Sequence, residues 1–516
     1  MRHARTRLGR TLLGALGAAA LIGTAVTGPA TAASAQARPT AASSQISGFG
    51  PDVLADKARP PAPAKPSDAK ASARHGNDCS PSSLKAKAAK AQPLNSSAPS
   101  ELRGKKMATC VTFNEPDARL NKESAKARDA ALNKARTVSA ANIKGRDLSS
   151  LKAAKLKAGN GIAKQSKSIL DLPQYCYDRK FQGWAGYRNE QCRIDDVTLY
   201  FFDVSDKGAP VWIGTAKALE YDFVYTSDIV DKFAHQIRVS KYWGERSGNN
   251  EFASFISGMS WCDGDCKPER DTGLRPGQFV KDVNNDGEAF YDSTRGEPGG
   301  IGFNHSFWEW NAEVFPFIPA APVVIEAPQV RCDNAFDDDG NNSGDPAFVT
   351  RATVGAGCVF NGVMPVMIYS KSGAYPTLAR HIGAAQASGL PGAYPNGAVL
   401  TRLTNKYDKR RNGDTACPSK WVRPNLKSCD EYPFRSSYQG AYTQTPKGTG
   451  RTFAPPNISW CEMDPRWGVP VGVTGPTGWS SCMIPATENS RGGSALGAFY
   501  KTNRVLDKDA YQVWIQ

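Results

Sequence analysis

Short apolar segments rich in aromatic and β-branched residues recur through the middle of the chain. Examples are residues 196–202, 209–214, 235–242 and 363–369, and they are separated by Gly, Asn, Asp and Pro. Segments of this length, bounded by turn residues, are typical of the strands of a sandwich or barrel. The pattern therefore predicts an all-β-rich domain of unknown role over residues 170–365.

After residue 366 the pattern becomes a mixture of helix and strand. Apolar residues at helical spacing predict a helix that opens at residue 375, and Asn489 is placed to cap a second, short helix. Residues 399–403 and 510–515 have the composition of strands. We therefore expect a small α+β domain over residues 366–516, in a multidomain protein.

The first 37 residues have the pattern of a signal peptide. Four arginines precede an apolar stretch, and small residues that suit cleavage end at Ala35 or Ala37. The apolar stretch is short and broken by Gly, which favours a removed signal over a retained anchor. No later stretch is long and apolar enough to span a bilayer, so we expect a secreted, extracellular protein.

Residues 38–165 form a low-complexity lead-in rich in Ala, Lys and Pro. Residues 59–66 resemble an extended linker, and residues 122–136 have helix propensity with little apolar face. This composition favours a disordered segment with a solvated or transient helix. Two other readings are a basic arm that binds the cell wall or DNA, and a removable or inhibitory propeptide.

Cysteine content and charge agree with export. All 12 cysteines follow the signal, and an even number in an exported chain indicates disulfides. Cys262 and Cys266 have zinc-ligand spacing, but there is neither a second close pair nor a His at finger spacing. The net charge is +15, and the segment from Lys371 holds 18 Lys and Arg against 9 Asp and Glu. This concentration fits a surface that neutralises phosphates, although basic residues also serve solubility.

Two acidic loops lie in the β-rich domain, at residues 282–288 and 333–340. The first places oxygen donors at alternate positions, as at the start of a calcium loop, but Ser293 occupies the position of the twelfth-residue Glu. An EF-hand is therefore not supported. Both loops fit either a Ca²⁺ site in the central domain or solvated Asx-rich turns.

The strongest chemical signal is the sequence Cys429-Asp-Glu-Tyr-Pro-Phe434, which places Asp430 and Glu431 in a strongly basic segment. An adjacent acidic pair is usually a solvated cap or a salt-bridge partner. Cleavage of a phosphodiester, however, needs a base for water, a metal and cations that hold the backbone. If this segment is a strand, the two side chains point to opposite faces, and we expect Asp430 to point inward.

Asp430-Glu-Tyr-Pro-Phe434 resembles the DEYPF signature of the NucA/NucB deoxyribonuclease family. Residues 488–494, Glu-Asn-Ser-Arg-Gly-Gly-Ser, resemble the later motif of that family, and residues 375–382 resemble its upstream helix. The closing residues 499–515 also fit. Arg435 departs from the family pattern, in which a small residue commonly follows the Phe, and Arg491 adds a further basic residue. The resemblance covers little more than a quarter of the chain and nothing before Val363.

The resemblance implies a ββα-metal-like fold and metal-dependent endonuclease activity on DNA, without sequence preference. Asp430 would activate water, Glu431 would be a neighbouring essential carboxylate, and Glu488 and Asn489 would face a divalent metal, Mg²⁺ or Mn²⁺. A helix N-terminus disfavours a cation, so Asn489 fits a simple cap equally well.

Other residues of the C-terminal segment have candidate roles. His381, the last His in the chain, is expected to be a structural partner rather than a catalytic group. The disulfides that we expect first are Cys417–Cys429 and Cys461–Cys482, although the sequence leaves other pairings open. The candidate DNA-phosphate contacts, for which a solvated basic loop is the alternative, are Arg402, Lys409, Arg410, Arg411, Arg435 and Arg491.

Two functions compete at this point. The first is a secreted deoxyribonuclease that hydrolyses phosphodiester bonds of a DNA substrate. The second is a non-catalytic secreted protein whose central domain binds a cell-wall polymer or glycan and whose basic domain binds nucleic acid. Carboxylates that face phosphate favour the first, because a mere binder of DNA gains nothing from them.

Overall fold

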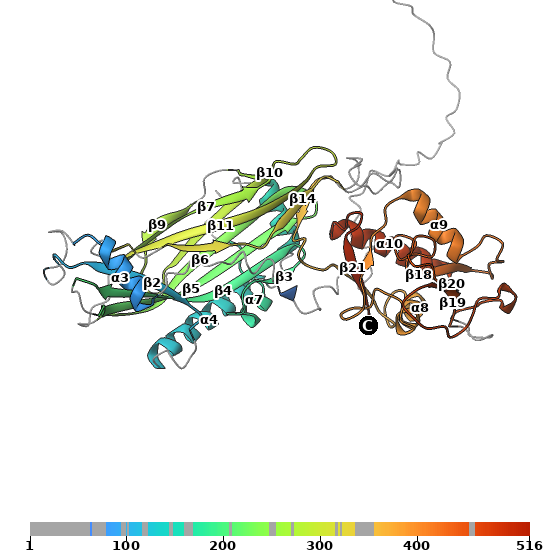
Figure 1. Cartoon of the computed structure of the whole chain (residues 1–516), viewed down its shortest axis with the longest axis horizontal. Coiled ribbons are helices and arrows are strands. Elements are labelled where there is room, and N and C mark those ends of the chain that lie inside the picture. Colours follow the sequence, from blue (N-terminus) through green and yellow to red (C-terminus); the bar gives the residue numbers. More distant parts are fainter. Residues whose placement is uncertain are drawn as a thin grey trace, which may run out of the picture. The chain divides into compact units, whose positions relative to one another are not determined.

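Two large antiparallel β-sheets are the main feature of the computed structural model (Figure 1). The structure describes residues 62–63, 79–93, 100, 103–115, 122–143, 148–158, 169–205, 209–246, 254–269, 273–314, 318–319, 322–335, 355–453 and 460–516. All of these belong to one unit, Phe49–Gln516. The signal peptide expected over residues 1–37 lies outside the described residues, as does most of the acidic loop 333–340.

The first large sheet has eight strands. Its strands are β1 (Ala62–Pro63), β2 (Met107–Phe113), β3 (Ala185–Tyr187), β4 (Glu190–Asp203), β5 (Val211–Ser227), β6 (Val230–Arg246), β8 (Cys266–Pro268) and β10 (Asn284–Ser293). They follow the order β1-β3-β4-β5-β6-β10-β8, and β2 pairs with β4. The long strands β4, β5 and β6 form its centre.

The second large sheet has seven strands. These are β7 (Ser254–Gly264), β9 (Leu274–Gln278), β11 (Ile301–Val314), β12 (Ile318–Pro319), β13 (Val323–Glu326), β14 (Val330–Asp333) and β15 (Gly357–Val359). Their order is β15-β14-β11-β7-β9, with β12 and β13 both paired to β11. The β-rich central region expected from the sequence is confirmed.

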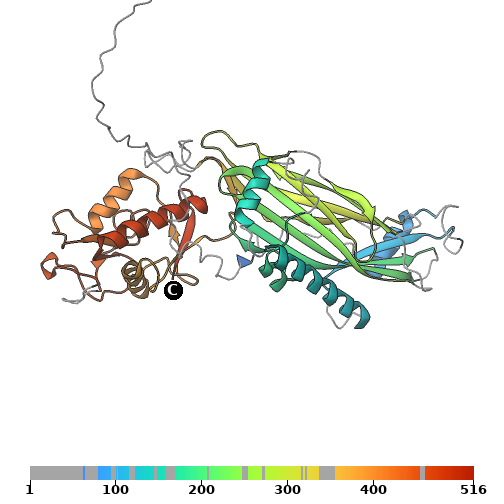
Figure 2. The same ribbon diagram turned by 180° about the vertical axis from the view of Figure 1, so that it is seen from behind.

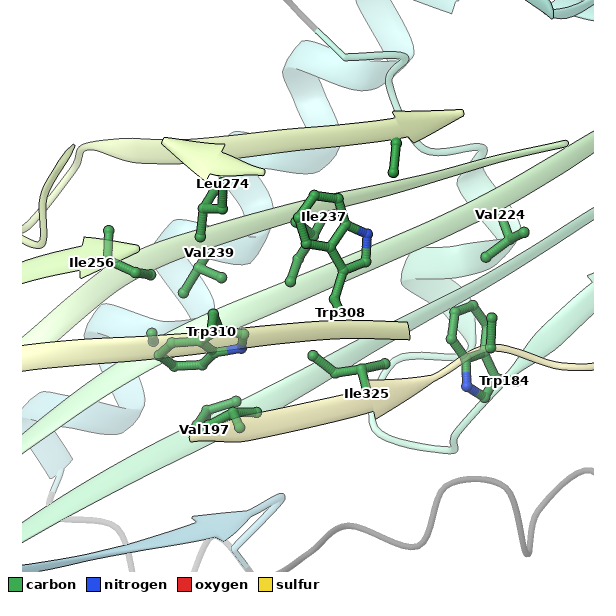
Figure 3. Close-up of a cluster of buried hydrophobic side chains, with 14 of the residues drawn as sticks. Trp184, Val197, Val224, Ile237, Val239, Ile256, Leu274, Trp308, Trp310 and Ile325 are labelled. Atoms are coloured by element: carbon green, nitrogen blue, oxygen red, sulfur yellow. The ribbon is translucent and has the colours of Figure 1, made fainter. Parts of the chain in front are cut away.

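The main core of this region contains side chains from both large sheets. Trp308 and Trp310 of β11 are fully buried there, beside Ile237 and Val239 of β6 and Val197 of β4 (Figure 3). Successive side chains of a strand point to opposite faces, so alternate residues of each strand supply this core. Burying one side chain of this size stabilises the fold by about 1.5–3 kcal/mol.

Helices cover the other face of the first sheet. They are α3 (Pro81–Lys90), α4 (Lys122–Ile143), α5 (Leu148–Ala158) and α7 (Gln174–Asp178). Both α4 and α5 contact β6 (Figure 2), and Leu132 and Leu156 are buried in a core cluster on this face. The expectation of a solvated lead-in is therefore wrong for α4 and α5, and β2 also belongs to the sheet. Small Ala side chains let α4 pack closely on the sheet, although the helix lacks the apolar stripe that usually indicates a buried face.

The C-terminal region is a smaller α/β mixture. Its elements are β16 (Val366–Tyr369), α8 (Pro376–Ala387), β17 (Leu400–Thr401), α9 (Lys406–Ala416), β18 (Lys427–Tyr432), β19 (Gly450–Arg451), η5 (Pro465–Trp467), β20 (Trp479–Pro485), α10 (Ala486–Thr502) and β21 (Ala510–Ile515). They form two three-stranded sheets, β16-β21-β17 and β18-β20-β19. The helix expected from residue 375 and the strands expected at 399–403 and 510–515 are present.

One helix start differs from the prediction. Helix α10 begins at Ala486, directly after β20, and Pro485 occupies its N-cap position. Asn489 therefore lies inside the helix and does not cap it. The preference of Asn for caps was the only local signal, and the strand that runs into the helix overrides it.

All 12 cysteines form disulfides. The pairs are Cys79–Cys110, Cys176–Cys192, Cys262–Cys266, Cys332–Cys358, Cys417–Cys429 and Cys461–Cys482. Both predicted pairs are confirmed, and the zinc reading of Cys262 and Cys266 is wrong. Six disulfides indicate an oxidising, extracellular type of environment. Within the described part of the chain, no helix has the length and apolar character needed to cross a membrane.

Candidate active site

The C-terminal region contains a cavity of about 1110 Å³. It is lined by residues of α9, β18 and α10 and by the segment that follows β17, and all of them lie between Tyr369 and Tyr500. Among them are the predicted site residues Arg402, Arg410, Asp430, Glu431, Arg435 and Asn489. Residues that are distant in the sequence therefore meet at one concave surface, which is the usual form of a ligand site.

Strand β18 carries the acidic pair and is held from two sides. It pairs antiparallel with β20, which places Asp430 opposite Cys482 in register. The disulfide Cys417–Cys429 joins the strand to the end of α9. The backbone at Asp430 is thus fixed by a ladder on one side and a covalent link next to it, as a preorganised site requires.

Asp430 forms a short hydrogen bond with a buried histidine of α8. His381 Nδ1 lies 2.5 Å from Asp430 Oδ2, and His381 Nε2 lies 2.8 Å from Ser480 Oγ. An ionised carboxylate can only accept, so Nδ1 of His381 donates to it, while Nε2 is hydrogen-bonded to the Ser480 hydroxyl. His381 was expected to be a structural partner, and its contact with Asp430 shows which residue it orients.

Glu431 points to a different partner, as alternation along the strand requires. Its Oε1 accepts from Nε of Arg435 at 2.8 Å, and Sγ of Cys417 lies 3.7 Å from its Oε2. Burial raises the pKa of Glu431 above its usual value, although the Arg435 guanidinium opposes this shift. Glu431 is thus paired with a cation, whereas Asp430 is oriented by a histidine, which leaves Asp430 as the better candidate base.

The two α10 residues expected to face a metal point in different directions. Asn489 lines the cavity, and its Nδ2 donates to Ser428 Oγ and to the Cys429 carbonyl, both at 3.0 Å. Glu488 does not line the cavity. Its carboxylate accepts from the backbone N–H and the hydroxyl of Thr377, in the first turn of α8. Successive helix residues project about 100° apart, so the structure gives Glu488 a helix-capping role.

The basic residues expected to hold phosphate divide into two groups. Arg410 and Arg435 line the cavity with largely exposed side chains. Arg402 also lines it, but this guanidinium lies over the Tyr500 ring at 4.3 Å and donates to the Val505 carbonyl, and burial lowers the pKa of Arg402.

Arg411 and Arg491 do not line the cavity. Arg411 donates to Tyr442 Oη at 2.5 Å, and Arg491 is exposed on α10. Lys406 and Lys409 do line it, together with Arg410. Lys406 was missed by the sequence analysis, although its spacing of three and four residues from Lys409 and Arg410 places all three on one helix face.

The cavity offers oxygen donors to a divalent cation. Asp430, Glu431 and Asn489 all line it, and both amide hydrogens of Asn489 are used elsewhere, so its Oδ1 remains as the coordinating atom. Within the described residues, no three His, Cys, Asp or Glu side chains form a group that could hold a metal ion. This donor set nevertheless fits Mg²⁺ or Mn²⁺, because Mg²⁺ usually takes one or two carboxylates and completes its shell with water and substrate phosphates.

The acidic residues of the loop at 282–288 contact polar groups on neighbouring elements. Strand β10 runs through it, and its carboxylates meet cations on neighbouring elements. Asp286 accepts from Arg238, and Glu288 accepts from Lys155 and Tyr225. Asp286 and Glu288 thus form ion pairs with Arg238 and Lys155, and the expected Ca²⁺ site of the central domain stays a prediction.

Comparison of the chain with family models, with curated proteins and with solved structures gives no match. The function is therefore argued from the cavity and from the sequence motifs that line it.

Proposed function

We propose that residues 366–516 form a secreted, metal-dependent, sequence-nonspecific DNA endonuclease. The observation that carries the proposal is the buried Asp430 carboxylate, which is bonded to His381 and lines a cavity that Lys406, Lys409 and Arg410 also line. A carboxylate would repel DNA unless it takes part in the chemistry, whereas the cations attract the phosphate backbone.

The residues divide the work as follows. Asp430 takes a proton from the attacking water while His381 holds the carboxylate in one orientation. The cations of α9 hold the phosphates on either side of the scissile bond, and Arg435 neutralises Glu431 in the free protein. Asp430 or Glu431, together with Asn489, would hold a divalent metal, which would supply positive charge at the phosphate that is cut.

The chain order of the elements supports the same class of enzyme. Strands β18 and β20 pair antiparallel, α10 follows β20 directly, and α10 contacts both strands. This is the strand–strand–helix order implied by the resemblance to the NucA/NucB family. The motif residues Asp430 and Asn489 then meet at one cavity although 59 positions separate them in the sequence.

The test is cleavage of supercoiled plasmid DNA by the secreted full-length chain. We expect nicked and linear products with Mg²⁺ or Mn²⁺, loss of cleavage with chelator, and recovery when metal is added in excess. The variant Asp430→Ala should be inactive. Glu462→Gln removes a carboxylate of the same region that pairs with Lys427 outside the cavity, and it should retain full activity.

A non-catalytic DNA-binding protein is the competing function. It would retain plasmid DNA in a gel-shift assay, with or without chelator, and would produce no nicked form at any metal concentration. That result would overturn the proposal.

A further inference from the structure

Helix α9 carries a second exposed face beside the residues that line the cavity. Lys406, Lys409 and Arg410 face the cavity, whereas Tyr407 and Arg411 lie one position further round the helix. The Tyr407 side chain is 76% exposed, which is unusual for a ring of this size. The core of the C-terminal region does not account for it, so its packing gives no reason for a Tyr at this position.

Tyr407 belongs to a ladder of rings and cations, which we call the aromatic flank: Tyr407, Arg411, Tyr442 and Lys447. The Arg411 guanidinium carbon lies 5.9 Å from the ring centroid of Tyr407 and 4.9 Å from that of Tyr442. Lys447 Nζ lies 4.6 Å from the Tyr442 ring centroid. Cations thus alternate with rings along the flank.

The flank is rigidly attached to the helix that lines the cavity. Asn412 Oδ1 accepts from the backbone N–H groups of Tyr442 and Thr443, at 2.8 and 3.0 Å. Its Nδ2 donates to the carbonyls of Arg435 and Ser437. Because Asn412 is fully buried, this clamp holds the loop that carries Tyr442 against α9. The backbone positions that carry the two rings are therefore fixed relative to each other.

We propose that the aromatic flank stacks on unpaired bases, so that the site prefers single-stranded or frayed DNA over intact duplex. This inference rests on the proposed function and specifies its substrate. Rings interleaved with cations beside a basic groove are the usual means of holding single-stranded nucleic acid, because every base has a stacking face. An intact duplex offers its phosphates to the cavity but hides its base faces, so the ring of Tyr407 gains nothing from it.

The test compares three 15-nucleotide probes: oligo-dT, the same length of abasic deoxyribose phosphate, and a duplex. Binding is measured by fluorescence anisotropy on the full-length chain carrying Asp430→Ala. We expect that Tyr407→Ala weakens oligo-dT binding at least about 5-fold, since one stacked base contributes that much or more, and leaves binding of the abasic strand and the duplex unchanged. Tyr407→Trp should retain oligo-dT binding.

Val422→Ala is the matched control, because Val422 is 78% exposed in the same region and lies outside both the flank and the cavity lining. Equal effects of Tyr407→Ala on all three probes, or none on oligo-dT, would overturn the inference. A companion assay follows cleavage of the same strands with Asp430 restored and Mn²⁺ present. Base-dependent binding without cleavage would contradict the proposed nuclease function but support the role of the aromatic flank. Cleavage that Tyr407→Ala leaves unchanged would support the nuclease function but contradict the role of the flank.

Discussion

Buried carboxylates occur in both the β-rich region and the C-terminal region, but their surroundings differ. In the β-rich region Asp195, Glu220 and Asp222 are fully buried with Arg193 and His235. Arg193 donates to Asp195, and His235 Nε2 lies 3.6 Å from Asp222. None of these residues lines the cavity, and their neighbours in the fold are the tryptophans of the main core.

In the C-terminal region the buried carboxylates Asp430 and Glu431 reach a cavity with cationic walls. Burial raises the pKa of Glu431, and it also raises the pKa of Asp222, to about 7. A shifted pKa therefore does not distinguish a reactive site from a structural network. The two regions differ in whether the buried carboxylates line a cavity. We therefore expect variants in the two regions to behave differently.

The largest expected effect is the contrast between Asp430→Asn and Asp222→Asn. Each change replaces one buried carboxylate by an amide of the same shape. Loss of a general base lowers rates by about 10²–10⁴-fold, so Asp430→Asn should lower plasmid cleavage by that factor. Asp222→Asn should leave cleavage at pH 7 within about 2-fold, because it removes no group from the cavity. Similar losses in both variants would show that the contrast between the regions is wrong.

The next effect concerns the orientation of Asp430. His381→Asn removes the ring that bonds Asp430 and Ser480, and the carboxylate can then turn in its site. A misplacement of about 1 Å can lower a rate by about 10²-fold, and we expect a loss of that size in kcat with KM for DNA unchanged. Ser480→Ala, which removes only the second hydrogen bond, should lose less. A fall in thermal stability that matches the lost activity would instead indicate a purely structural role.

A smaller effect is the pH dependence of stability in the β-rich region. Asp222 ionises near pH 4 in the unfolded chain but has a pKa of about 7 when folded, because of burial. Between these values the folded state holds more protons, so this group contributes stability that is lost as pH rises from about 4 to about 7. The melting temperature of Asp222→Asn, minus that of the natural chain, should therefore increase across this window and then level off.

His235 acts in the opposite sense. Burial lowers its pKa to about 3, so its contribution is lost as pH falls from about 6.5 towards 3. Because His235 lies 3.6 Å from Asp222, the comparison is repeated in a His235→Gln background, which removes this contribution from both chains. A flat difference curve would mean that Asp222 does not titrate as its surroundings require.

The smallest effect is the salt dependence of DNA binding. Arg410 lines the cavity with an exposed side chain, so Arg410→Gln should remove about one phosphate contact. The slope of log affinity against log salt should then fall in magnitude by about 1. Arg466 is exposed and pairs with Asp464 outside the cavity, so Arg466→Gln should leave the slope unchanged. Equal salt-dependence slopes for the two variants would show that the DNA backbone does not contact Arg410.

Much of the fold was predictable because its signals are local. Short aromatic and β-branched runs bounded by turn residues identified parts of β4 and β6, apolar spacing identified α8, and an even cysteine count indicated disulfides. The packing of α4 was missed because Ala residues carry little hydrophobic signal. The acidic pair was found from its motif and three basic residues of α9 from their charge, but the helix itself was not predicted.

The contacts that complete the site could not be read from the sequence. His381 meets Asp430 across 49 positions, and Glu488 turns towards Thr377 while its neighbour Asn489 faces the cavity. Each of these pairings depends on how α8 and α10 pack on the sheet. No local pattern encodes that packing.

The most direct measurement follows DNA binding and DNA cleavage side by side on the Asp430→Ala chain, with Mn²⁺ present. We expect affinity for plasmid DNA within about 3-fold of the natural chain, because the cations of α9 are untouched, together with loss of detectable nicking. Nicking at the natural rate would show that Asp430 is not the base, and the central proposal would then fail.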